Sequence, residues 1–255
     1  NTANDGTEPW NPVTLPASTA ARIRVTSVSN GTISDVSDAN FSIVARTITV
    51  TSPNGGETWV VGDVNNVTWT STGLSENVRI EINRTYPSAS WTDIIASTPN
   101  DGVHPWTVTS PTGSTTRVRI SGTVTTTVKD TSDANFTIGI RTITVTVPNG
   151  GETWPVGSLQ TVTWTSQNVT GTVNLQLNRG YPGPTWENIA LGTTNDGSEP
   201  WTVTVPATTT ARVRVVSVSY ATIGDSSNAN FTITTPNNPP TIAHDPLDDQ
   251  TVQPF

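Results

Sequence analysis

Apolar and polar residues alternate along much of this chain with a period of two. Val78, Ile80 and Ile82, for example, alternate with Arg79 and Glu81. This period places successive side chains on opposite faces of a β-strand. Similar runs recur between clusters of Gly, Pro, Asn and Asp, and within one stretch they predict eight short strands. We expect these strands at residues 47–52, 56–60, 66–71, 77–84, 91–97, 105–109, 116–121 and 134–139.

The sequence also repeats itself at an interval of 95 residues. The heptapeptide Pro-Asn-Gly-Gly-Glu-Thr-Trp at 53–59 returns at 148–154, and Val-Thr-Trp-Thr-Ser at 67–71 returns at 162–166. Aligned without a gap, residues 47–141 and 142–236 agree at about half of their positions. Residues 1–46 match only the second half of this unit, up to a closing Ser-Asp-Ala-Asn-Phe. The chain is therefore organised as an array.

Seven or eight short strands in a unit of this size are typical of an immunoglobulin-like sandwich. The sequence predicts an all-β chain of tandem immunoglobulin- or fibronectin-III-like sandwiches. No flexible spacer separates the two full copies, so we expect consecutive sandwiches to stack stiffly. The half copy and the missing initiator methionine indicate a window on a longer polypeptide. We expect the second half of a repeat at 1–46, complete repeats at 47–141 and 142–236, and a linker with the first strand of another domain at 237–255.

Large aromatic side chains are the main candidates for the core of each sandwich, because each buries about 150–250 Å². Trp69 lies on the predicted second strand and is expected to anchor its repeat. The expected core aromatics are Trp69, Trp106 and Phe136 in one repeat, and Trp164, Trp201 and Phe231 in the next.

Composition excludes several classes of partner and chemistry. The 12 basic and 20 acidic residues give a net charge of −8, which argues against nucleic acid and acidic membranes as partners. The chain has no cysteine, so disulfides and cysteine-ligated metals are excluded. No apolar run reaches the roughly 20 residues of a membrane-spanning helix.

Three motifs in one order resemble a known domain family. They are the heptapeptide, Val-Thr-Trp-Thr-Ser about eight residues later, and the closing Ser-Asp-Ala-Asn-Phe-Thr-Ile. Together they resemble the Ser/Thr-rich, KNH-like domain named from fungal cell-wall and GPI-anchored surface proteins, which is common as tandem repeats in bacterial secreted proteins. The resemblance implies an extracellular immunoglobulin-like sandwich in a secreted or surface protein. It transfers no catalytic residue.

Candidates for catalysis are few, and we expect no enzyme. A nucleophilic triad needs a base beside the nucleophile, but the only histidines are His104 and His244. The repeated carboxylates at Glu57 and Asp101 follow turn signals, which favours a structural role over paired-carboxylate chemistry.

Two sets of residues are candidates for ligand contact. Acidic residues precede the last strand of two copies, in a predicted loop that could hold calcium or simply be solvated. No other cofactor is expected. Aromatic residues in a loop of variable composition could stack on sugar rings, or pack against the sheet edge or a neighbouring domain. The calcium candidates are Asp35, Asp38, Asp130 and Asp133, and the glycan candidates are Tyr86, Trp91, Tyr181 and Trp186.

Three functions follow from these observations. The first is a non-catalytic stalk, fibre or filament region of a large extracellular or cell-surface protein that supports adhesion or display. The second is a carbohydrate-binding or adhesive module of a secreted hydrolase. The third is a filament subunit whose half repeat is completed by strands from a neighbouring chain, because a half sandwich exposes an apolar face. The partners are accordingly neighbouring repeats, identical subunits or cell-wall and surface glycans.

Overall fold

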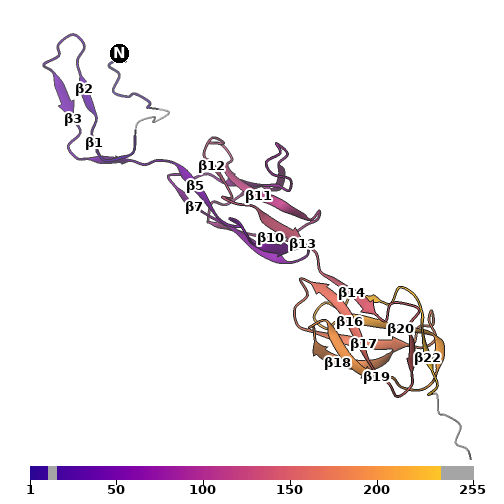
Figure 1. Cartoon of the computed structure of the whole chain (residues 1–255). Coiled ribbons are helices and arrows are strands. Elements are labelled where there is room, and N and C mark those ends of the chain that lie inside the picture. Colours follow the sequence, from indigo (N-terminus) through magenta and orange to yellow (C-terminus); the bar gives the residue numbers. More distant parts are fainter. Residues whose placement is uncertain (11–15, 237–255) are drawn as a thin grey trace, which may run out of the picture. The chain divides into compact units, whose positions relative to one another are not determined.

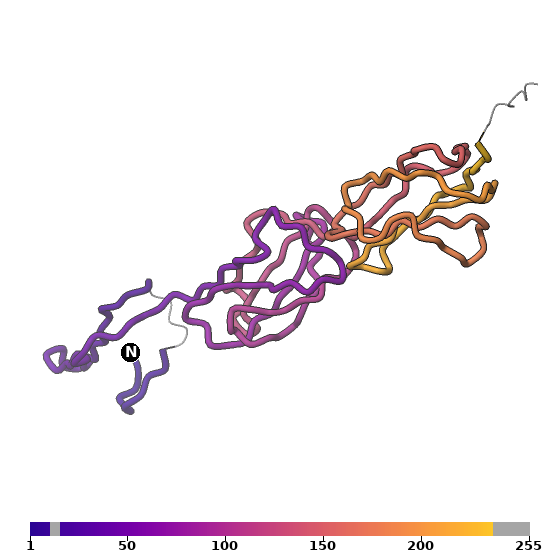
Figure 2. Tube along the Cα trace, turned by 90° about the horizontal axis from the view of Figure 1, so that it is seen from below, coloured from indigo at the N-terminus to yellow at the C-terminus, as the bar shows by residue number. Residues whose placement is uncertain are grey.

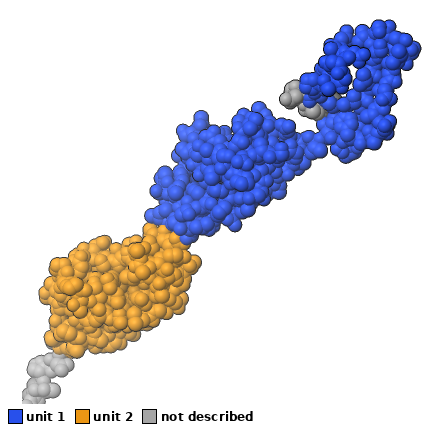
Figure 3. Space-filling model, turned by 180° about the vertical axis from the view of Figure 1, so that it is seen from behind, with its two compact units in different colours: residues 1–140 blue, residues 141–255 orange. Residues whose placement is uncertain are grey.

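Strands provide the regular structure of residues 1–10 and 16–236, which are the residues that this computed structural model describes. The all-β prediction is confirmed, and none of these residues forms a helix that could cross a membrane. The chain divides into two compact units, Asn1–Ile140 and Arg141–Phe255 (Figure 3). The linker and strand predicted at 237–255 lie outside the described residues.

The first unit contains one complete repeat, built as two facing sheets (Figure 1). The smaller sheet has the order β10 (Val103–Thr107), β7 (Val64–Thr72), β5 (Thr47–Ser52). The larger sheet has the order β6 (Thr58–Val60), β13 (Phe136–Gly139), β11 (Gly113–Gly122), β8 (Val78–Asn83), β9 (Thr92–Thr98), and β12 (Lys129–Thr131) pairs with β11. Only the β6–β13 pair is parallel in this repeat as described.

The second unit repeats this topology strand for strand. Its smaller sheet has the order β14 (Thr142–Val147), β16 (Leu159–Gln167), β19 (Ser198–Thr202). Its larger sheet has the order β15 (Thr153–Pro155), β22 (Phe231–Thr234), β20 (Thr208–Ser217), β17 (Thr172–Asn178), β18 (Glu187–Thr194), and β21 (Gly224–Ser226) pairs with β20.

The period-two pattern fills the space between the sheets. Ile80 on β8 and Ile120 on β11 point inward and are fully buried, whereas Arg79 between such positions is exposed. Trp69 on β7 is only 3% exposed, and its indole Nε1 donates to Asn100 Oδ1 at 2.7 Å, so burial leaves its polar group satisfied. The six core aromatics lie in two separate clusters, one per repeat: Trp69, Trp106 and Phe136, and Trp164, Trp201 and Phe231.

The repeated motifs meet in space because they bond to one another. Ser132 of the closing motif is buried, and its Oγ donates to the Pro53 carbonyl at 2.7 Å while accepting the Val118 amide at 3.1 Å. Asn54 of the heptapeptide accepts the amide of Asp133 at 2.7 Å. The second repeat has the same buried serine contact. The motifs thus join the start of the sandwich to its end.

Short strands appear where a loop is expected. Asp130 lies within β12 and Asp35 lies within β3 (Ser34–Val36), so the prediction of a loop at these two positions is wrong. Backbone pairing with β11 orders Lys129–Thr131, although this segment has no apolar alternation that could signal a strand. Asp38 and Asp133 lie outside strands.

The outermost strands of the larger sheets pair irregularly. The pairing of β9 with β8 shifts register between Val78 and Ile80 and again between Ile80 and Glu81. The pairing of β18 with β17 shifts at the corresponding places. Each of these edge strands therefore departs twice from a straight ladder.

The strands of the half repeat pair as their counterparts in the complete repeats do, but the face that is buried there is exposed here. Its strands β1 (Ser18–Ala21), β2 (Arg24–Thr26), β3 and β4 (Phe41–Ile43) form the pairs β1–β4 and β2–β3. They lie in the indigo N-terminal part of the trace in Figure 2. Val25 on β2 is 71% exposed, whereas its counterpart Ile120 is 0% exposed. The strands that bury this position in a complete repeat, such as β8, have no equivalent among the described residues here.

Candidate functional site

Two arginines of β11 stack on aromatic rings from the segment between β8 and β9. The guanidinium carbon of Arg117 lies 4.3 Å from the ring centre of Tyr86, and that of Arg119 lies 4.3 Å from Trp91. Arg119 also forms a 2.7 Å ion pair with the buried Glu81. The outer face of the larger sheet therefore carries a row of alternating rings and charges.

This row continues toward the sheet edge through an exposed ion pair. Arg79 Nε lies 2.6 Å from Asp93 Oδ1. The hydrogen bond with Asp93, together with the charge of Glu81, raises the pKa of Arg79. The guanidinium stays charged at any physiological pH.

The second repeat has the same stacking with fewer charges. Arg212 lies 4.0 Å from the ring centre of Tyr181, and Arg214 lies 4.3 Å from that of Trp186. Arg214 donates from Nε to Gln176 Oε1 at 2.7 Å, where the first repeat has a carboxylate. Amides thus replace the ion pairs while the cation–π contacts remain.

The arginine contacts occupy part of the surface that a sugar would need. Tyr86, Trp91, Tyr181 and Trp186 are all half-buried, and each has a guanidinium over its ring. A cation–π contact of this kind contributes about 0.5–1 kcal/mol at an exposed site. The geometry favours packing on the sheet, and sugar stacking on the remaining ring surface stays a prediction.

A cleft of about 500 Å³ opens between the two sheets of the first repeat, next to Arg84. The walls include Ile82 from β8, Thr92 from β9 and Trp106 from β10. Arg84 donates from Nη1 to the Pro111 carbonyl and from Nη2 to Thr109 Oγ1, both at 2.9 Å. Its guanidinium carbon lies 5.9 Å from the Trp106 ring centre. Burial lowers the pKa of Arg84, because the charged form loses hydration.

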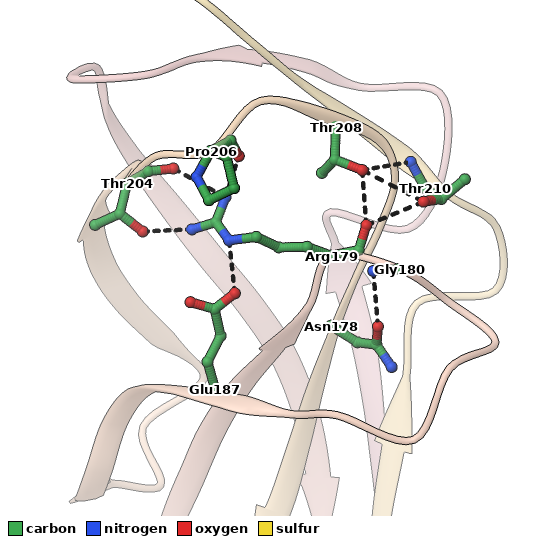
Figure 4. Close-up of polar contacts among 8 residues, drawn as sticks. All are labelled: Asn178, Arg179, Gly180, Glu187, Thr204, Pro206, Thr208 and Thr210. Atoms are coloured by element: carbon green, nitrogen blue, oxygen red, sulfur yellow. Dashed lines mark hydrogen bonds and ion pairs between the residues drawn. The ribbon is translucent and has the colours of Figure 1, made fainter.

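The corresponding arginine of the second repeat has one further partner. Arg179 donates from Nη2 to Thr204 Oγ1 at 2.6 Å and from Nη1 to the Pro206 carbonyl at 2.6 Å, as its counterpart does. Its Nε also donates to Glu187 Oε1 at 2.6 Å, and Figure 4 shows the guanidinium enclosed by these groups. Hydrogen bonds from Thr208 and Thr210 hold the Arg179 carbonyl and fix the backbone from which the side chain extends.

Two of the four calcium candidates, Asp130 and Asp133, make side-chain contacts within the protein. Asp130 Oδ2 accepts the Val50 amide at 2.8 Å, beside the register shift between β5 and β7. Asp133 Oδ2 accepts from the Asn54 side chain at 2.7 Å. Among the residues described, no group of three or more His, Asp or Glu side chains is arranged to hold a metal ion. Calcium binding stays a prediction. In the structure the Asp130 carboxylate joins β12 to β5, and the Asp133 carboxylate joins the segment before β13 to the segment after β5.

The other repeated carboxylates stabilise turns. Glu57 accepts the backbone amides of Asn54 and Gly55 through its two oxygens, both at 2.7 Å. Asp101 accepts the amide of Val103 at 3.2 Å. The second repeat repeats both arrangements. His104 is half-buried on β10, and His244 lies outside the described residues.

The strand pattern and the repeated motifs give no sign that Arg84, Thr92 or Glu187 belongs to a site. The signal that could have found them is a difference between the copies. Position 92 is threonine and position 187, one repeat later, is glutamate, although the arginine eight residues before each is the same.

The two units define the chain as a tandem array of immunoglobulin- and fibronectin-III-like β-sandwiches. No protein-family model matches the sequence, and no curated protein matches it significantly. The fold is similar to solved structures at low sequence identity. Fibronectin(III)-like modules of CbhA from Clostridium thermocellum share 13% identity over 74% of this chain and 95% of theirs, with a TM-score of 0.26.

Two further structures illustrate the likeness. The first two immunoglobulin domains of DIP-gamma share 8% identity over 74% of this chain and 97% of theirs, with a TM-score of 0.37. The titin tandem I9–I11 shares 10% identity over 74% of this chain and 66% of its own, with a TM-score of 0.42. These likenesses concern the fold alone.

Proposed function

We propose that this chain is a structural repeat region of an extracellular or cell-surface protein and that it acts as a non-catalytic spacer for adhesion or display. The observation that carries the proposal is that each complete repeat has a core of its own. In addition, only residues 140 and 141 separate β13 from β14. Units that fold separately and follow one another so closely suit an array whose length grows with copy number.

The details of the repeats support a mechanical role. The buried serine contact and the hydrogen bond that the Val50 amide donates to the Asp130 carboxylate both link segments about 80 residues apart. Such bonds must break before a repeat can extend. The resemblance of the three motifs to the KNH-like family supports the extracellular location.

Single-molecule force spectroscopy on the full chain tests the proposal. We expect two separate unfolding events, each releasing about 95 residues, or roughly 310–340 Å of contour length at about 3.3–3.6 Å per residue. A matched variant with Trp164→Ala should lose the mechanical resistance of one event and keep the other. A single event that releases both repeats together would contradict the independence of the units.

A second candidate, a filament subunit, is favoured by one observation. The half repeat exposes Val25 and Ile33 at 71% and 63% of their surface, whereas their counterparts Ile120 and Val128 lie in or against the core of the complete repeat. A neighbouring chain that supplied the missing strands would cover them. Sedimentation of the full chain tests this: concentration-dependent association that Val25→Asp abolishes supports the filament, and a monomer at all concentrations contradicts assembly of this chain alone.

A further inference from the structure

The cleft beside Arg84 has a cation whose side-chain position is fixed by the protein. The two terminal nitrogens of Arg84 bond to Pro111 and Thr109, and these bonds hold the guanidinium plane in place. No partner of its Nε is found within residues 1–10 and 16–236. The polar edge of a fixed guanidinium thus faces a cleft of about 500 Å³, which lies in the range of small-molecule sites.

The second repeat shows which group completes this arrangement. Glu187 begins β18 opposite Leu177, and Thr92 begins β9 opposite Ile82, so the two residues occupy the same register position. The Glu187 carboxylate lies 2.6 Å from the Nε of Arg179. Thr92 has a hydroxyl in place of a carboxylate, and its Oγ1 is 3.4 Å from the Ile82 carbonyl. The second repeat therefore carries a carboxylate on the Nε of its arginine, and in the described part of the first repeat no carboxylate takes that place.

We propose that the cleft of the first complete repeat binds an acidic sugar through its carboxylate, with the carboxylate on Arg84 Nε where Glu187 lies in the second repeat. Hydroxyl groups of Ser90, Thr92 and Ser110 line the cleft and can bond to sugar hydroxyls. Ile94 and Pro111, which are not buried, supply apolar surface for the ring.

Electrostatics at the cleft suit an anion despite the acidic chain. Asp93 also lines the cleft, but it is paired with Arg79 at 2.6 Å, and this pairing reduces repulsion. Burial removes water that would otherwise compete for the Arg84 guanidinium, so a carboxylate that binds there meets a partly dehydrated cation. Long-range repulsion from the net charge of −8 is screened beyond about 8 Å at physiological ionic strength.

This site is separate from the rings of Tyr86 and Trp91, and the inference does not depend on the spacer role. A spacer can carry a binding site in one of its units, and a binding unit need not be mechanically strong. Failure of the force experiment would leave the cleft unaffected.

The experiment uses the full chain with D-galacturonate and D-galactose as probes, which differ at the carboxylate. Titration followed through the Nε–H signals of the arginine side chains in ¹H–¹⁵N spectra reports binding at Arg84 and Arg179 separately. We expect saturable binding of galacturonate at Arg84, at least about tenfold weaker binding of galactose, and no response of Arg179.

Two variants exchange the key residue between the repeats, and a third is a neutral control. Thr92→Glu supplies the internal carboxylate and should abolish galacturonate binding, whereas the neutral control Thr92→Gln should weaken it less. Glu187→Thr should create a second site at Arg179. All three changes are at the start of an edge strand, and a thermal melt checks that each variant is folded.

The outcomes decide the inference. Equal binding of galacturonate and galactose, or full binding by Thr92→Glu, overturns the role of the carboxylate. Tighter binding of an acidic peptide such as acetyl-glutamate amide than of galacturonate overturns the sugar as the ligand. The absence of any galacturonate response at Arg84 up to millimolar concentrations also overturns the proposal.

Discussion

Ser132 Oγ donates a 2.7 Å hydrogen bond to the carbonyl of Pro53, 79 residues earlier in the chain. The same buried hydroxyl accepts the amide of Val118, so it joins three segments of one sandwich. We expect Ser132→Ala to lower the unfolding free energy of the first complete repeat by about 1–3 kcal/mol, because it leaves buried backbone groups without a partner. Chemical denaturation measures this, with Ser37→Ala as control. Ser37 occupies the same place in the exposed half repeat, so a similar loss there would contradict the explanation.

Trp69 fills the centre of its repeat and bonds to Asn100. We expect Trp69→Ala to lower the unfolding free energy of that repeat by about 3–5 kcal/mol, because truncation leaves a cavity. Calorimetry should show one transition moved to lower temperature and the transition of the second repeat unchanged. An unchanged melting temperature for both would exclude Trp69 as a core anchor.

Asp130 holds the Val50 amide at the bulge between β5 and β7. Asp130→Asn should lower stability by about 1 kcal/mol, since a neutral amide oxygen is a weaker acceptor than a carboxylate. Asp225, which makes the same contact in the second repeat, is the matched site. We expect calcium to leave the melting temperature of the native chain unchanged. A rise with calcium that Asp130→Asn removes would assign a metal to this position.

Trp91 packs beneath the guanidinium of Arg119. Trp91→Ala should cost about 0.5–1 kcal/mol of stability through the lost cation–π contact. A neutral-glycan array should respond equally to the native chain and to the Trp91→Ala and Trp186→Ala variants. Loss of glycan signal in these variants would show that the rings act as sugar platforms.

Glu76 gives a pH dependence whose sign follows from its contacts. Desolvation raises the pKa of Glu76, but hydrogen bonds from Thr125 and Val124 outweigh it, so the pKa is lowered. Because the pKa of Glu76 is lower in the folded state, its ionised carboxylate stabilises the fold at pH values above the unfolded-state pKa of about 4.3. This contribution is lost as the pH falls through the folded-state pKa. The native protein should thus have a higher free energy of unfolding than Glu76→Gln at neutral pH, and the difference between the two should disappear in acid. A constant difference down to about pH 2 would contradict this.

The strand pattern and the repeat together predicted the two-sheet architecture, because inward positions such as Ile80 and Ile120 follow a strict period of two. They did not predict β12, whose three residues are held by pairing with β11 rather than by any apolar pattern. The cleft at Arg84 was also missed. Its walls come from segments up to about 30 residues apart, and only packing brings these segments together. The sequence does show that Thr92 and Glu187 differ at equivalent positions. This difference points to a site only once the structure shows that Glu187 pairs with Arg179.

The two register shifts along β9 and along β18 affect whether these edge strands can pair with strands of another molecule. An edge strand with a straight row of unpaired amides and carbonyls can pair with the same edge on another molecule and begin aggregation. A ladder interrupted twice within seven or eight residues offers no such continuous row. Two larger sheets can therefore lie side by side without merging through β9 or β18.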